Sequence, residues 1–160
     1  KRYVSCLLLV PEDEDLARYY ETLGYTRQNA CTRQTLQADS PGGAAGAVPP
    51  QDYAGLRETL LFDTPHVRYS KTLLTYAAED LTFYRLELGY ALGCAAVRRA
   101  DGGTVVEELL PDARMLPALA AALGTGPYSV RTPGRSALCC MAKRTDGAAP
   151  APVWLAFDFD

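Results

Sequence analysis

The chain has 160 residues, of which 48% are hydrophobic and 22% charged, and its formal net charge at pH 7 is −3. This is ordinary globular composition for one domain or two small ones. It offers no basic excess for nucleic acid, and no apolar run approaches the roughly 18 residues that cross a bilayer. Five cysteines without a Cys-x-x-Cys pair, beside a single histidine, argue against a disulfide framework and against a metal site. We therefore expect a cytoplasmic protein with plain thiols, which begins partway through a longer sequence because it opens on Lys1.

The first elements are a strand and a helix. Residues 3–10 form a nearly continuous apolar run, which is typical of a strand buried on both faces. Pro11 ends the run, and the acidic residues 13–15 favour the start of a helix, whose N-terminus carries partial positive charge. Gly24 suits the left-handed position after the last helical turn. The hydrophobic residues between these signals recur with helical spacing: Leu16, Tyr19, Tyr20 and Leu23.

The middle of the chain is less regular. Residues 26–38 are expected to be extended, and residues 40–50 form a flexible connector of Gly, Ala and Pro. A short helix is predicted over residues 53–61 and a second over residues 70–78. We place a domain boundary between them, which divides the chain into residues 1–64 and residues 65–160.

After residue 80 the hydrophobic period becomes two. Strands are predicted over 81–87, 90–99 and 104–110, a helix over 112–123, and further strands over 128–131, 137–143 and 153–159. Glu107 and Glu108 are adjacent within an expected strand, so they should face opposite sides. We expect a solvated strand face there, the alternative being that one of them lines a cleft between domains. The fold class is α+β.

The segment LLLVPEDEDLARYYETLGY resembles the last motif of the GNAT superfamily of N-acetyltransferases, in which a strand precedes a helix with the pattern A-x-x-x-Y-E-x-x-G-[FY]. The match is Ala17, Tyr20-Glu21 and Gly24-Tyr25. The wider sequence resembles two-domain bacterial members related to the enhanced-intracellular-survival acetyltransferases. The resemblance implies the C-terminal portion of a GNAT fold and a helical connector in residues 1–64. A second GNAT-like or sterol-carrier-like mixed-sheet domain would then occupy residues 65–160.

The resemblance also implies an activity, the transfer of acetyl from acetyl-CoA to a primary amine of a small molecule or peptide. Tyr20 would be the general acid that protonates the departing CoA thiolate, since a phenol near pKa 10 is protonated at neutral pH. The alternative is that Tyr20 is simply an inward residue of an amphipathic helix. Asp160, if it is the natural C-terminus, would help to deprotonate the amine; otherwise it is a solvated chain end.

The loop that holds the CoA pyrophosphate in this superfamily, R/Q-x-x-G-x-G/A, does not occur in the sequence. The turn Leu110-Pro111-Asp112-Ala113, which joins a strand to a helix, contains no glycine. We therefore expect acetyl-CoA as co-substrate of the intact protein and an inactive fragment. The competing hypothesis is a non-catalytic module that shapes a substrate pocket or mediates homo-oligomerisation.

Overall fold

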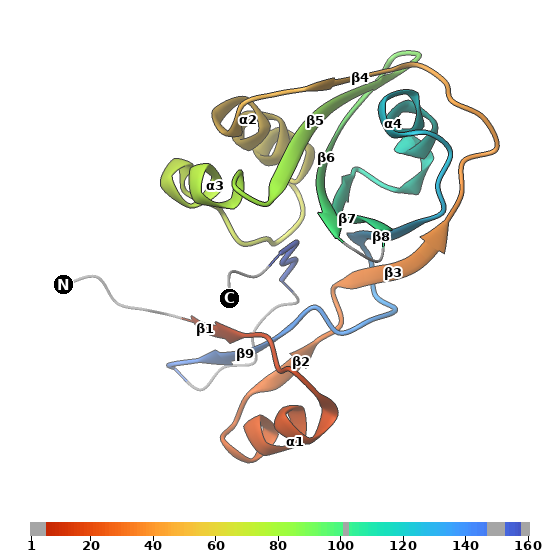
Figure 1. Ribbon diagram of the computed structural model, residues 1–160. Helices are drawn as coiled ribbons and strands as arrows, with labels where there is room; N and C mark the ends of the chain where they lie inside the picture. Colours follow the sequence, from red (N-terminus) through yellow and green to blue (C-terminus); the bar gives the residue numbers. More distant parts are fainter. Residues whose placement is uncertain (1–5, 101–102, 147–152, 158–160) are drawn as a thin grey trace.

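The computed structural model describes residues 6–100, 103–146 and 153–157, which form two antiparallel-dominated sheets and several short helices (Figure 1). The smaller sheet has the order β1-β9-β2, with β1 at Cys6–Leu9, β9 at Cys140–Arg144 and β2 at Thr26–Gln28. Helix α1, Glu14–Thr22, connects β1 to β2 and contacts β2. The predicted first helix is thus confirmed.

The larger sheet has the order β3-β8-β7-β6-β5-β4. Its strands are β3 (Cys31–Leu36), β8 (Tyr128–Pro133), β7 (Gly103–Leu110), β6 (Ala91–Ala100), β5 (Leu81–Leu88) and β4 (Ala44–Ala47). All neighbours are antiparallel except β7 and β8, which are parallel and pair only at Val105–Ser129 and Val106–Val130. The α+β class is therefore confirmed. Strand β4 lies in the segment expected to be a flexible connector. Its Ala and Gly residues have low strand propensity, so the sequence does not predict this strand.

Helices cover both faces of the larger sheet (Figure 1). Helices α2 (Pro50–Leu60) and α3 (Lys71–Ala77) pack with the segment 153–157 in one core, around Tyr53, Leu74 and Trp154. The 3₁₀ turn Ala113–Met115 and helix α4 (Leu116–Leu123) pack in the other core. Elements before and after residue 64 share one sheet and one core, and the division into residues 1–64 and 65–160 stays a prediction.

The two sheets are joined by strands that follow one another in sequence. Strands β2 and β3 are separated by two residues but belong to different sheets, and so do β8 and β9. The pair β3–β8 belongs to the larger sheet, and β2–β9 to the smaller one. In the smaller sheet, the late strand β9 therefore pairs with the early strand β2, and in the larger sheet the early strand β3 pairs with the late strand β8.

The first strand differs from its prediction. Within the described residues, β1 pairs only with β9, and Leu7 and Leu8 are 42% and 37% exposed. A strand buried on both faces needs neighbours and covering helices, and the described residues supply neither on the free side of β1. The expected last strand, residues 153–159, is described only as far as Phe157; there it forms a single bridge between Trp154 and His66.

Candidate functional site

Tyr20 lies on the last full turn of α1, a helix with well-defined ends. The Asp13 side chain accepts a hydrogen bond from the Leu16 N–H at 2.8 Å, which caps the N-terminus. At the other end, Gly24 has φ of 83°, and the Tyr25 N–H donates to the Tyr20 carbonyl at 3.1 Å. These are the bonds of a Schellman ending, in which glycine avoids the strain of a positive φ. The predicted helix boundaries are confirmed.

The Tyr20 ring is half-buried against the Tyr25 ring, with centroids 5.7 Å apart in an edge-to-face arrangement. Tyr19 is 57% exposed on the neighbouring face of the helix. Arg27 of β2 holds the helix to the sheet, because its guanidinium reaches Glu14 at 2.7 Å and Glu21 at 2.7 Å. The hydrogen bond from Arg27 lowers the pKa of Glu14. Helix α1 thus presents Tyr20 in a fixed orientation. Asp160, the second residue assigned to catalysis, lies outside the described residues.

The turn from β7 leads into a 3₁₀ turn and then into α4, a strand-to-helix connection of the kind in which phosphate-binding loops occur. Asp112 caps this turn: its carboxylate accepts from the Arg114 N–H at 2.9 Å and is also bonded by the Arg114 guanidinium, with a shortest contact of 2.6 Å. These bonds lower the pKa of Asp112. A carboxylate therefore already occupies the N-terminal end where an anion would bind, and it would repel a pyrophosphate. This geometry agrees with the absence of a glycine-rich loop from the sequence.

Glu107 and Glu108 do not face opposite sides, contrary to the expectation from strand alternation. Ala96 pairs with Glu108 while Val97 pairs with Val106, so Glu107 is the extra residue of a β-bulge. Both carboxylates are buried rather than solvated, at 4% and 0% exposure. Both are also linked to the segment 153–157. The bulge therefore places two adjacent acidic side chains on the α2 face of the sheet.

Glu108 is the centre of a buried polar network. It accepts hydrogen bonds from the Tyr53 hydroxyl, from the Arg57 Nε at 2.9 Å and from the Trp154 indole N–H at 2.5 Å. Arg57 also donates to the Val67 carbonyl at 2.7 Å. Tyr53 and Arg57 belong to α2, Glu108 to β7 and Trp154 to the segment 153–157, so the network ties these three parts of the chain together. Its burial makes it a structural site rather than a substrate site.

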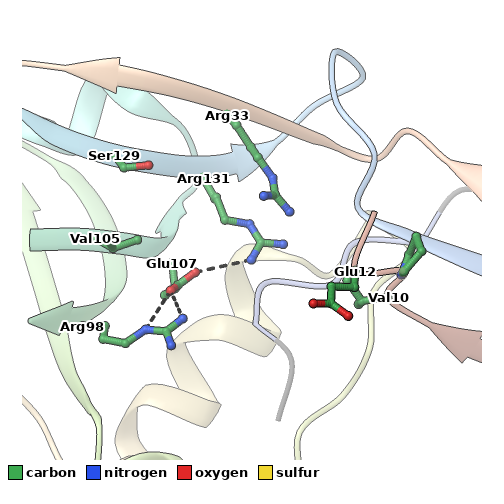
Figure 2. A pocket seen from close by; sticks show the side chains of 9 residues that line it. Val10, Glu12, Arg33, Arg98, Val105, Glu107, Ser129 and Arg131 are labelled. Atoms are coloured by element: carbon green, nitrogen blue, oxygen red, sulfur yellow. Dashed lines mark hydrogen bonds and ion pairs between the residues drawn. The ribbon is translucent and has the colours of Figure 1, made fainter. Parts of the chain in front are cut away.

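Glu107 belongs instead to an open cleft of about 680 Å³ (Figure 2). Its carboxylate is paired with Arg98 of β6 and with Arg131 of β8, the latter at 3.4 Å. Arg131 also donates to the Leu155 carbonyl at 3.2 Å. The cleft lies between the larger sheet and the connection from β1 to α1, and its lining is completed by Val10, Pro11, Glu12, Arg33, Val105 and Ser129.

No sequence motif marks this cleft, although Glu107 lines it, as the alternative interpretation of the two adjacent glutamates allowed. The charged residues of the cleft come from β3, β6, β7, β8 and the connection from β1 to α1, and they carry no common motif, so only the folded arrangement brings them together. The single histidine, His66, lies elsewhere, with Nε2 3.0 Å from a Glu58 carboxylate oxygen. Among the described residues, no group of three histidine, cysteine or acidic side chains is arranged to hold a metal ion. Nor is any helix of the described residues long and apolar enough to span a membrane.

Neither a protein-family model nor a curated protein matches the chain. A solved structure does match, the crystal structure of a GCN5-related N-acetyltransferase from Kribbella flavida, with a TM-score of 0.58 at 18% sequence identity. The similarity covers 89% of this chain and 44% of that protein. The fold is of the GCN5-related N-acetyltransferase type. This chain therefore corresponds to less than half the length of the protein that it resembles.

Proposed function

We propose that this chain is part of an acetyl-CoA-dependent N-acetyltransferase in which Tyr20 is the general acid, and that its own larger sheet does not bind the cofactor. The observation that carries the proposal is the strand–helix unit of β1 and α1. There the motif residue Ala17 is buried and the ring of Tyr20 is half-exposed. Gly24 follows the last turn of the helix with a positive φ. The fold likeness covers the whole arrangement of sheets but does not by itself establish activity.

The proposed chemistry requires one proton from Tyr20. The acceptor, a primary amine of a small molecule or peptide, attacks the thioester carbonyl, and the C–S bond breaks to release CoA as a thiolate. A phenol hydroxyl can act as the general acid that gives this proton to the thiolate. The thioester is supplied by acetyl-CoA bound outside the turn at Asp112, and the Asp160 carboxylate would accept a proton from the amine.

The test uses the natural protein that contains this chain, with acetyl-CoA and a panel of primary amines. Tyr20→Phe removes only the hydroxyl and should lower kcat by about 10²–10⁴-fold, with acetyl-CoA affinity nearly unchanged. Tyr19→Phe is the matched control and should keep normal kcat, because its ring lies on the exposed side of the helix. Normal kcat in Tyr20→Phe would remove the general-acid assignment.

A second candidate is a non-catalytic module related in shape to N-acetyltransferases. The observation that favours it is the turn at Asp112, where the Asp112–Arg114 pair closes the N-terminal end that would receive a phosphate. In this alternative the larger sheet binds a ligand or partner and supports a catalytic domain elsewhere. No acetyl transfer by the natural protein with any amine in the panel would favour this candidate.

A further inference from the structure

The open cleft beside β7 and β8 carries an excess of positive charge on one face of the sheet. Arg33 and Arg131 are directly opposite each other in the antiparallel pair β3–β8, so their side chains share a face. Arg98 is opposite Val105 in β6–β7 and joins the same face, since residue pairs in register lie on one side of a sheet. Figure 2 shows the guanidinium groups of Arg33 and Arg131 beside each other in the cleft.

Among the described residues, the lining of the cleft contains fewer carboxylates than guanidinium groups. Glu107 is shared between Arg98 and Arg131, and its contact to Arg131 is long, at 3.4 Å. Glu12 lies across the cleft, on the connection from β1 to α1 (Figure 2). Like charges directly opposite each other on neighbouring strands destabilise a sheet unless an opposite charge lies between them. Three arginines and two glutamates thus line the cleft.

The surroundings of Arg131 are a second, independent indication that the cleft binds an anion. The Arg131 side chain is 10% exposed, and its Nε atom is buried with no hydrogen-bond partner among the residues that the structure describes. Buried donors of charged groups are costly to leave unsatisfied, and few native side chains do so without a ligand or functional reason. A guanidinium also presents a planar set of donors that matches a carboxylate or a phosphate.

We propose that this cleft binds a small organic oxyanion, a carboxylate or a phosphate ester, through Arg33 and Arg131. At about 680 Å³ the cleft has room for a small molecule rather than an inorganic ion alone. Glu107 holds Arg98 and orients Arg131, while Glu12 faces the end of the ligand remote from the arginines. The proposal goes beyond acetyl transfer and does not depend on it.

The test follows the arginine side-chain Nε–H signals of the full chain by NMR during titration at constant ionic strength. Succinate is the carboxylate probe and inorganic phosphate is the phosphate probe. We expect saturable shifts at Arg131 or Arg33 with at least one probe, and the tighter probe identifies the class of ligand. Shifts that do not saturate with either probe would overturn the proposal.

Two variants make the test specific. Arg33→Gln changes an exposed side chain, so the fold should persist, and affinity should fall about fivefold or more with the loss of one charge-assisted contact. Arg99→Gln is the matched control, because Arg99 is also exposed and lies on the opposite side of β6 from Arg98. Equal affinities in the two variants would show that the arginine pair binds no anion. Acetyl transfer is measured separately, so failure here leaves the Tyr20 assignment untouched.

Discussion

At the scale of single residues, the adjacent glutamates of β7 have different surroundings, because Glu108 lies in a buried polar network and Glu107 lines the open cleft. Strand alternation places neighbours on opposite faces, and it fails at Glu107 because a β-bulge inserts an extra residue there. A bulge depends on the partner strand, so the sequence of β7 alone does not reveal it. The same bulge separates a buried structural carboxylate, Glu108, from a cleft carboxylate, Glu107.

Substituting Glu107 and Glu108 separately compares how much each carboxylate contributes to the stability of the fold. Glu108→Gln removes the buried counter-charge of Arg57, leaving it only the more distant, partly exposed Glu58 at 3.7 Å, and should lower the free energy of unfolding by about 3–5 kcal/mol. Glu107→Gln should cost only about 1–2 kcal/mol, because the Arg98 side chain is 48% exposed and its charge can be solvated, while the contact to the buried Arg131 is long and Arg131 keeps its hydrogen bond to the Leu155 carbonyl. Urea denaturation of both variants measures the difference. Equal losses would mean that the network around Glu108 contributes no more than the cleft pair.

Two buried tyrosines, Tyr53 and Tyr69, should make the stability of the fold depend on pH under alkaline conditions. Burial raises the pKa of Tyr69 and that of Tyr53 well above the value near 10 of an unfolded chain. Above pH 10 the unfolded chain therefore releases protons that the folded chain keeps. Stability from these groups is complete below pH 10 and falls above it, by up to about 1.4 kcal/mol per pH unit for each group.

Tyr69→Phe tests this dependence. The variant loses the hydrogen bond from the hydroxyl to the Phe157 carbonyl, so its stability at neutral pH should be lower. Its slope of stability against pH above 10 should nevertheless be shallower than that of the wild type. Denaturant unfolding at a series of alkaline pH values gives the slope, with Tyr90→Phe, a fully exposed ring, as control. An unchanged slope in Tyr69→Phe would contradict the prediction.

At the scale of elements, local signals were enough for α1 but not for its neighbours. The cap at Asp13, the apolar spacing and Gly24 all lie within the helix and its ends, so the sequence predicts its boundaries. The burial of β1 depends on what lies beside it, and β4 depends on its pairing with β5 rather than on its Ala and Gly residues. The cleft could not be predicted, because Arg33, Arg98 and Arg131 meet only through strand pairing.

The N-terminal cap of α1 can be tested alone. Asp13→Ala removes the acceptor of the Leu16 N–H and should destabilise the helix by about 1 kcal/mol. Asp15→Ala is the control: Asp15 contributes charge to the same turn but only a 3.6 Å contact to Arg18 between exposed side chains. Circular dichroism during thermal unfolding compares the two. A melting temperature lowered equally in both variants would show that charge, rather than the cap, stabilises α1.

At the scale of the whole molecule, each of the two sheets combines strands from the N-terminal and C-terminal parts of the chain. Strand β9 fills the smaller sheet between β1 and β2, while β3 forms an edge of the larger one. The GCN5-related N-acetyltransferase fold was anticipated from a motif in α1, and the structure extends the likeness to 89% of the chain. Because unpaired strand edges favour pairing with a second strand, we expect self-association through the edge of β1, where Leu7 and Leu8 are exposed.

This chain shares the fold of part of a GCN5-related N-acetyltransferase, and we propose that its larger sheet does not hold the cofactor. Calorimetric titration of acetyl-CoA into the full chain tests it most directly. We predict no saturable heat, because Asp112 and Arg114 occupy the turn where the pyrophosphate would bind. Saturable binding with a micromolar dissociation constant would contradict the claim, and its loss in a variant of the turn would place the cofactor there.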